Sequence, residues 1–204
     1  MNQQLAHTEH RDYTGSKLGM WFFLFTEVLL FGGLFLVYSV YRAMHPGEFH
    51  EAAKELSTVI GAANTVILLT SSLTIAASIS AIQRGSRKLS ILLQSTTLLF
   101  GALFLVNKYF EWSAKFQHGL YPDAPELLER GHGQILFYGL YYVMTGLHGL
   151  HVLAGLVLIG AMLYFTARER VNSRNFGWLE NSGLYWHLVD IIWIYLFPLF
   201  YLIT

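Results

Sequence analysis

Residues 56–83 read LSTVIGAANTVILLTSSLTIAASISAIQ and contain no Asp, Glu, Lys or Arg. A helix needs about 20 predominantly apolar residues to cross the hydrocarbon core of a bilayer, so this stretch is long enough to span a membrane. A segment in lipid must satisfy its backbone hydrogen bonds internally, which favours a helix over an isolated strand. The stretch therefore predicts a transmembrane helix, which we place at residues 60–83.

Four further stretches are similarly long and poor in charged residues. They predict transmembrane helices near residues 17–43, 88–116, 133–168 and 181–203. The ten-residue segments of alternating hydrophobicity that are typical of an outer-membrane β-barrel are absent from the sequence. The predicted fold is therefore all-α: a polytopic membrane protein whose residues 17–204 form one domain, a bundle of five transmembrane helices.

The composition agrees with this class. The chain has 204 residues, of which 54% are hydrophobic and 13% charged, whereas soluble domains carry roughly 25% charged residues. The mean hydropathy is +0.43. The formal net charge is zero and there is no Cys, which argues against a nucleic-acid-binding protein, a disulfide scaffold and a thiolate metal site.

The basic residues are distributed unequally between the two predicted sides of the membrane. One side carries eight, namely Arg11, Lys17, Arg84, Arg87, Lys88, Arg168, Arg170 and Arg174, and the other carries Arg42, Lys54, Lys115 and Arg130. Cytoplasmic loops are enriched in Lys and Arg, so we expect the N-terminus inside and the C-terminus outside. Residues 1–16 have no apolar core of a signal peptide, and we expect a flexible cytoplasmic tail there.

The connecting segments are short. HPGEFHEAAKEL, residues 45–56, predicts a short surface helix that begins near Pro46, because proline is favoured at the first position of a helix. LYPDAPELLERGHG, residues 120–133, predicts a turn-rich loop with a single helical turn.

Glu27 is the most unusual residue of the first predicted span. It lies about ten residues, or roughly 15 Å of helix rise, inside the membrane, where an ionisable group is costly. It is either a carboxyl group hydrogen-bonded inside the bundle or a partner in proton relay or lipid binding. We expect it to face the bundle or a partner subunit, to be protonated at neutral pH, and to bond His151 or a Ser or Thr of the second span.

Lys108 and Glu111 stand three residues apart on one helix face. We interpret them as a lysine that snorkels to the membrane surface and is paired with a carboxylate.

Histidines also recur at a spacing of three inside the predicted spans. His148 and His151 share the fourth span, and His187 precedes Asp190 in the fifth. Histidine is a common metal and haem ligand, but two histidines stacked on one helix do not face each other, and the repeated Glu-x-x-His of di-iron bundles is absent. We therefore expect hydrogen bonds between helices from these residues, and no redox centre in this chain.

Small residues indicate close contacts between helices. A row of small residues in the second span and glycines in the first and fourth predict such contacts, within the chain or with a partner: Ser72, Ala76, Ser80, Gly32, Gly33, Gly146, Gly149 and Gly155.

Several stretches together resemble subunit III of the haem-copper terminal oxidases. They are LGMWFFLFTEVLLFGGLFLVY (18–38), NTVILLTSSLTIAASISAIQRGSRK (64–88), NKYFEWSAKFQHGLYPD (107–123), TGLHGLHVLAGL (145–156) and FGWLENSGLYWHLVDIIWIYLFPLFYL (176–202). The HGLHV and YWH-x-VD-x-x-W strings carry the resemblance most specifically. The chain is similar to the short, five-helix bacterial form and leaves no room for the two additional N-terminal helices of longer members.

The resemblance implies a non-catalytic subunit without haem or copper, in a bacterial plasma membrane. Its partners would be the large subunit I, which holds the haems and copper, subunit II, further small subunits and membrane lipids, including bound phospholipid. It would support assembly, lipid binding and proton uptake of a proton-pumping oxidase that reduces oxygen to water in aerobic respiration. Glu27 matches the family's buried helix glutamate, and Glu111, His148, His151, His187 and Asp190 match its other characteristic polar positions. Lipid-binding residues of the two missing helices cannot be carried over.

Within this family the similarity favours a cytochrome c oxidase, with a quinol oxidase or a nitric-oxide-reductase-associated homologue as alternatives. A membrane b-type cytochrome and a proton-coupled transporter are alternatives of another class. We expect the subunit to dock on the large subunit mainly through its membrane helices, with the first and second spans as the candidate contacts.

Overall fold

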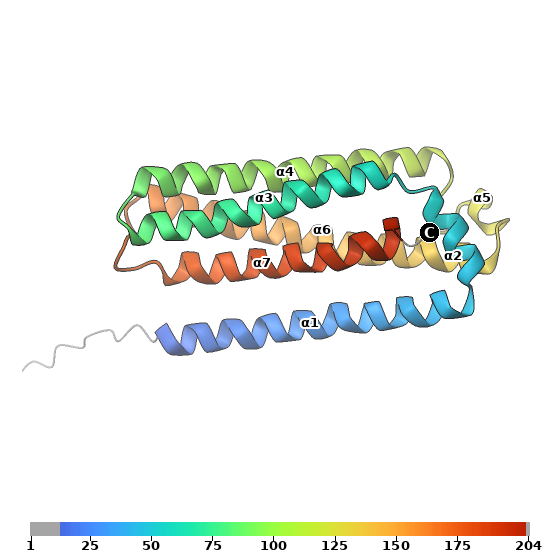
Figure 1. Cartoon of the computed structure of the whole chain (residues 1–204), viewed down its shortest axis with the longest axis horizontal. Helices are drawn as coiled ribbons and strands as arrows, with labels where there is room; N and C mark the ends of the chain where they lie inside the picture. Colours follow the sequence, from blue (N-terminus) through green and yellow to red (C-terminus); the bar gives the residue numbers. More distant parts are fainter. Residues whose placement is uncertain (1–12, 203–204) are drawn as a thin grey trace, which may run out of the picture.

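The computed structural model describes residues 13–202. Within them, five helices are long and apolar enough to cross a membrane: α1 (Tyr13–Met44), α3 (Thr58–Gln83), α4 (Arg87–Gln117), α6 (His132–Ala167) and α7 (Gly177–Phe197). They lie side by side along one common direction, and each is joined to the next by a short connection (Figure 1). The predicted all-α architecture with five spans is confirmed.

Three short elements lie at the end of the bundle where the described chain stops (Figure 1). They are α2 (Pro46–Lys54), α5 (Pro125–Leu128) and a π-helix, Pro198–Leu202. The predicted helix at Pro46 and the predicted helical turn before the fourth span are confirmed. α2 does not lie freely on the surface, because Phe49, Ala52 and Ala53 are buried beneath it.

Two helices begin before the predicted spans. α7 begins at Gly177 rather than near residue 181, because Glu180 does not end the helix but lies within it and pairs with Lys17 at 2.9 Å. α1 begins at Tyr13, so residues 13–16 are helical and do not belong to a tail. Asn181 donates a hydrogen bond to Ser16, which holds the start of α1 to α7. The rest of the predicted tail lies outside the described residues.

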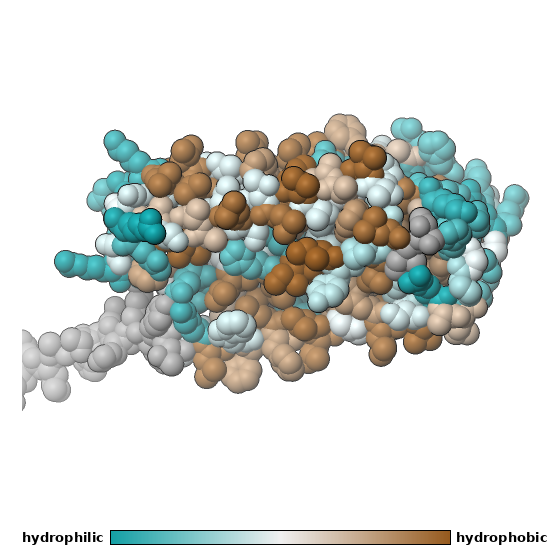
Figure 2. Space-filling view, in the orientation of Figure 1, coloured by the Kyte–Doolittle hydropathy of each residue, from teal (hydrophilic) through white to brown (hydrophobic). Residues whose placement is uncertain are grey.

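The apolar surface forms a broad belt between two polar ends (Figure 2). The start of α1 and the α3–α4 and α6–α7 connections share one end, and the last described residues lie at the other (Figure 1). An odd number of spans thus separates the two ends of the described chain. Lys17 therefore lies at the same end of the bundle as the basic residues of the 84–88 and 168–174 segments.

Trp186 of α7 fills the middle of the bundle and is fully buried. A Cβ atom added to Gly101 of α4 or to Gly155 of α6 would come within 2.7 Å of its indole ring. The indole also donates a hydrogen bond of 2.9 Å to Ser71 of α3. One tryptophan therefore joins four helices, and it fits because α4 and α6 present glycine where the ring lies.

The predicted role of glycine in helix contacts is confirmed for Gly155 and Gly146, which face Trp186 and Trp112. At Gly32, Gly33 and Gly149 an added Cβ would meet no atom of the described chain within 4 Å, so for these three the contact with a partner stays a prediction. These three glycines point away from the packed interior of this chain.

Helix α1 is the least buried of the five spans and stands apart from the other helices along much of its length (Figure 1). Leu24, Phe31 and Tyr38, spaced seven residues apart, form its buried stripe. The Tyr38 hydroxyl donates a hydrogen bond to the backbone carbonyl of Leu199. This narrow contact leaves most of the surface of α1 unoccupied by the rest of the chain.

Candidate functional site

Glu27 of α1 and His151 of α6 meet inside the membrane span. The Oε2 atom of Glu27 lies 2.9 Å from the Nε2 atom of His151, and both side chains are about 15% exposed or less. Phe31 contacts the imidazole edge-on, and Tyr185 stacks on it. The structure therefore brings together a predicted carboxyl group and one of its predicted partners, and the pair is largely shielded by aromatic rings.

The second nitrogen of His151 limits the protonation states of this pair. Its Nδ1 atom lies 2.8 Å from the carbonyl oxygen of Leu147, which can only accept, so Nδ1 carries a proton. The Nε2 atom then either accepts a hydrogen bond from a protonated Glu27 or, in the imidazolium, donates to an ionised Glu27. The pair is electrically neutral in both cases, and this reduces the cost of placing it in the membrane.

A second polar cluster lies within α4, α6 and the π-helix. Lys108 donates a hydrogen bond of 3.0 Å to Glu111, and the two residues are 7% and 6% exposed. The prediction that they pair is confirmed, but the interpretation of a snorkelling lysine is wrong. The Lys108 ammonium also donates to the hydroxyl oxygens of Tyr141 and Tyr201, at 3.1 and 3.0 Å, and these bonds hold it inside the bundle.

The two tyrosines were missed in the sequence analysis. Their hydroxyls donate to the Oε1 atom of Glu111 at 2.8 Å from Tyr141 and 2.6 Å from Tyr201. A buried tyrosine hydroxyl usually has a hydrogen-bond partner. The presence of tyrosines within two apolar spans could therefore have indicated polar partners inside the bundle. The cluster of Lys108, Glu111, Tyr141 and Tyr201 fixes the C-terminal segment to the bundle interior.

His148 does not make the predicted hydrogen bond. It is fully buried, and neither ring nitrogen has a hydrogen-bond partner among the described residues. The imidazole lies between Phe104 and Trp193, with ring centroids 5.5 and 5.4 Å away. His148 and His151 are three residues apart on α6 and point in different directions. His148 faces the core, whereas His151 faces α1.

His187 and Asp190 of α7 also separate. The Nδ1 atom of His187 lies 2.6 Å from the hydroxyl oxygen of Ser72 on α3, so the predicted bond between helices is present here. Asp190 is 2% exposed, and neither carboxyl oxygen hydrogen-bonds a described residue. Asp190 therefore makes no direct hydrogen bond to His187.

The titratable side chains do not converge on one point. Among the described residues, no three His, Asp or Glu side chains form a group that could hold a metal ion. The Glu27–His151 contact joins α1 to α6, and the His187–Ser72 contact joins α7 to α3. Glu111 of α4 is joined to α6 by Tyr141 and to the π-helix by Tyr201. Their common chemistry is hydrogen bonding between helices in an apolar medium.

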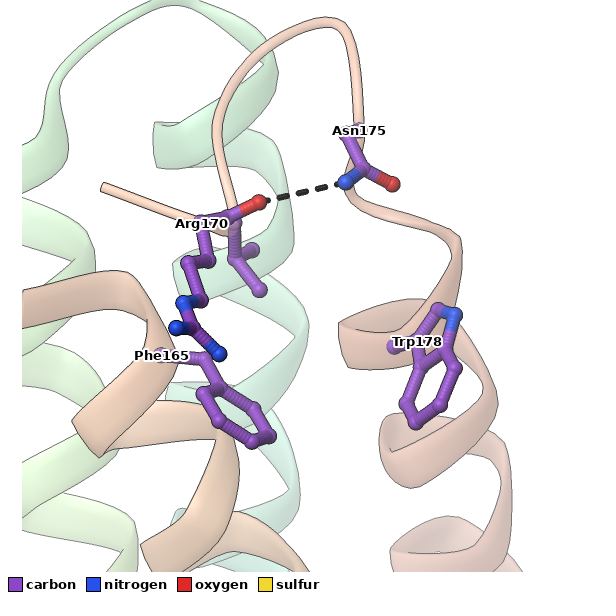
Figure 3. Close-up of a pocket in the computed structure, with 5 residues that line it drawn as sticks. Phe165, Arg170, Asn175 and Trp178 are labelled. Atoms are coloured by element: carbon purple, nitrogen blue, oxygen red, sulfur yellow. Dashed lines mark hydrogen bonds between the residues drawn. The ribbon is translucent and has the colours of Figure 1, made fainter. Parts of the chain in front are cut away.

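A hollow of about 380 Å³ lies where α6 ends and α7 begins (Figure 3). Phe165, Val171 and Trp178 provide its apolar lining, and Arg170 and Asn175 are its polar residues. Asn175 donates a hydrogen bond to the backbone carbonyl of Arg170, and the guanidinium group of Arg170 lies over the Phe165 ring at 6.0 Å. An apolar hollow with a cation and a tryptophan at the end of a membrane helix suits an anionic amphiphile.

Comparison with known proteins identifies the family to which this chain belongs. The family model described as cytochrome c oxidase subunit III matches residues 2–204. The chain belongs to the cytochrome c oxidase subunit III family. It is 35% identical over 204 residues to cytochrome c oxidase subunit 3 of Thermostichus vulcanus, and the match covers 98% of this chain and 91% of that protein.

Two further relatives show the range of this family. The chain is 29% identical over 206 residues to a protein of Aeropyrum pernix named heme-copper oxidase subunit I+III, in a match that covers 97% of this chain and 24% of that protein. It is 28% identical to the probable quinol oxidase subunit 3 of Staphylococcus saprophyticus, over 100% of this chain and 97% of that protein.

The resemblance to this family is therefore confirmed. The chain is a multi-pass membrane subunit of a haem-copper terminal oxidase, cytochrome c oxidase, in which subunit III is non-catalytic. The polar groups described above are consequently expected to act on structure, lipid or proton supply rather than on oxygen itself.

Proposed function

We propose that this chain packs against the large haem-copper subunit in a bacterial plasma membrane and stabilises it there, with subunit II and small subunits completing the complex. The Aeropyrum pernix relative carries this proposal, because its name places subunits I and III in one polypeptide. The wide apolar surface of α1 agrees with a partner in the membrane, since the chain itself covers little of that helix.

Purification through an affinity tag on this chain in a mild detergent tests the proposal. We expect the large subunit to co-purify, as identified by mass spectrometry, with a reduced-minus-oxidised spectrum of its haems. Recovery of this chain without the large subunit would contradict the proposal. Oxidation of cytochrome c by the purified complex, compared with oxidation of a quinol, distinguishes the two kinds of oxidase found among the relatives.

The proposed orientation places the N-terminus in the cytoplasm. It rests on the basic residues gathered at the end where α1 begins. The chain has no native Cys, so single cysteines can report on the orientation. A membrane-impermeant maleimide added to intact cells should label Asp123→Cys and leave Ser173→Cys unlabelled until the cells are opened. The reverse pattern would overturn the orientation.

We also assign the hollow at Arg170 to the phosphate group of a bound phospholipid. Arg170 makes no ion pair in the part of the chain that the structure describes, and Trp178 beside it is 57% exposed, as suits an interfacial residue. Mass spectrometry of lipids retained by the purified complex should show fewer anionic phospholipids in Arg170→Met than in the wild type. Arg174→Met, a charge change in the same loop but outside the lining, is the matched control and should retain them.

The Glu27–His151 pair is our candidate for the support of proton uptake. A carboxyl group and an imidazole 2.9 Å apart can exchange a proton without changing the net charge of the pair. If the pair supplies protons to the oxidase, Glu27→Gln should lower turnover while the complex still assembles. Unchanged turnover and proton pumping in an assembled Glu27→Gln complex would exclude this role.

A further inference from the structure

We propose that Asp190, Ser72 and His187 form a second proton-holding site inside the membrane span, in which the serine hydroxyl transfers a proton between the carboxyl group and the imidazole. The site does not involve the Glu27–His151 pair. Asp190 and His187 stand three residues apart on α7, so they share one face of that helix. Ser72 belongs to α3 and contacts this face through His187.

The carboxyl group of Asp190 is a neutral acid in these surroundings. It is 2% exposed, and neither oxygen has a hydrogen-bond partner among the described residues. An ionised carboxylate in an apolar medium needs a cation or several donors to offset its lost hydration. The neighbouring helix α3 lies within residues 56–83, which contain no charged residue and no histidine. Asp190 therefore keeps its proton and presents an O–H donor inside the bundle.

The titratable groups of the other surrounding helices do not supply a counter-charge to Asp190. His148 is the one that lacks a partner among the described residues, and it makes no hydrogen bond to Asp190 because it lies between two aromatic rings. The others are bonded elsewhere: Glu27 to His151, Lys108 to Glu111, Tyr201 to Glu111, Tyr185 to the backbone of His151, and Glu180 to Lys17.

Ser72 is placed to act as the bridge. Its hydroxyl oxygen lies 2.6 Å from the Nδ1 atom of His187, and it also neighbours the Asp190 carboxyl group. A serine hydroxyl can donate one hydrogen bond and accept two. Ser72 can therefore donate to Nδ1 of His187 and accept from the protonated carboxyl group of Asp190.

Proton transfer along these two bonds leaves the net charge unchanged. The O–H bonds of Asp190 and Ser72 break, and a new O–H bond on Ser72 and an N–H bond on Nδ1 of His187 form. The products are a carboxylate and an imidazolium, whose charges cancel. A neutral set of groups is less costly in the membrane than a single charge.

His187 connects the site to the surface of the helix bundle. Its side chain is only half-buried and lines a hollow of about 280 Å³ together with Trp21 and Leu24 of α1. Asp190 lies deeper, and Ser72 lies between the two. We therefore expect the proton of Asp190 to exchange with the medium through Ser72 and His187.

Infrared spectroscopy of the complex purified through this chain tests the protonation of Asp190. A protonated carboxyl group has a C=O band that shifts in D2O, and a carboxylate lacks this band. We expect Asp190→Asn to lose one such band, and Asp123→Asn, which changes an exposed aspartate in the loop before α5, to retain it. Aspartate labelled with heavy carbon in its side-chain carboxyl identifies the band in the wild-type complex if Asp190→Asn does not assemble. A labelled complex without a protonated aspartate would overturn the proposal.

Substitutions of Ser72 and His187 test the bridge. Ser72→Ala should slow deuterium exchange of the Asp190 band at least tenfold, and Ser72→Thr, which keeps a hydroxyl, should restore it. His187→Phe should slow the exchange but keep the band. Ser80→Ala, an exposed position of α3, is the control and should exchange as the wild type does. Unchanged exchange in Ser72→Ala and His187→Phe would overturn the proposal, as would a band that responds to His148→Phe and not to Ser72→Ala.

Discussion

The Lys108 ammonium and the Glu111 carboxylate lie 3.0 Å apart with almost no exposure, and two tyrosine hydroxyls, from Tyr141 and Tyr201, complete the hydrogen bonding of both. A buried ion pair is tolerated when the remaining donors and acceptors are satisfied. Because Tyr201 belongs to the π-helix at the end of the chain, the pair also determines where the C-terminal segment lies.

Removing one member of this pair should be strongly destabilising. We expect Lys108→Met or Glu111→Leu alone to cost about 3–5 kcal/mol, because each leaves an uncompensated charge in the bundle. The double variant should recover much of this loss. Thermal unfolding of the purified complex measures the effect, and Lys54→Met, which breaks an exposed pair with Glu51, is the control that should leave the unfolding temperature unchanged. Equal losses in the single and double variants would contradict this interpretation.

Substitutions of Glu27 should separate hydrogen bonding from charge. Glu27→Gln keeps a donor for the Nε2 atom of His151, so assembly of the complex should be largely intact. Glu27→Leu leaves that nitrogen without a partner and should cost about 1–3 kcal/mol. The yield and the unfolding temperature of the complex measure both changes. A Gln variant as unstable as the Leu variant would show that the ionised form holds α1 to α6.

A hydrophobic carbodiimide reports the protonation state of Glu27. This reagent needs a protonated carboxyl group in an apolar site, and Glu27 is 15% exposed within the span. We expect Glu27 to be labelled at neutral pH and Glu27→Gln to abolish the label, as detected by peptide mass spectrometry. Absence of labelling in the wild-type complex would indicate an ionised Glu27 paired with imidazolium.

Because Trp186 packs against Gly155, two glycine positions of α6 should differ sharply in their tolerance of a larger side chain. Gly155→Leu should prevent accumulation of the folded chain, since its Cβ alone would lie 2.6 Å from the indole ring. At Gly149 on the same helix an added Cβ meets no atom within 4 Å, and Gly149→Leu should accumulate normally. Fluorescence-detected size-exclusion chromatography of tagged chains compares them. Loss of both variants would indicate that Gly149 is covered by a partner subunit.

The isolated chain should carry no redox centre. His148 lies against Phe104 and Trp193 in the core, and His151 and His187 bond to Glu27 and Ser72. The visible spectrum of the chain separated from its partners should lack haem bands, and metal analysis should find no stoichiometric copper. Either centre, coordinated by one of these histidines, would contradict the prediction.

The five spans could be predicted from the sequence because hydrocarbon imposes a simple requirement. Long uncharged stretches such as residues 56–83 have few stable alternatives to a helix in a membrane. The ends of the helices were predicted less well. Charge was taken to mark them, whereas Glu180 lies in the first turn of α7, where a carboxylate is favourable, and pairs with Lys17, which is far away in the sequence.

The candidate polar residues were found from the sequence because ionisable groups inside a span stand out. Their partners were found less reliably. His148 and His151 are three residues apart, and the sequence suggested the same role for both. They have different neighbours because α6 packs against α1 on one side and α7 on another. Lys108 was interpreted as snorkelling because Tyr141 and Tyr201 are distant in the sequence.

The sequence by itself therefore determined the membrane class, the five spans, the family and the identity of the unusual polar residues. These properties follow from transfer of individual side chains between water and hydrocarbon, and from local motifs. The tertiary structure decided which helices meet, which glycines receive a ring, and that α1 stands apart with an open groove beside α7. Such features depend on the shapes of several helices packed together, and no single segment of the chain contains that information.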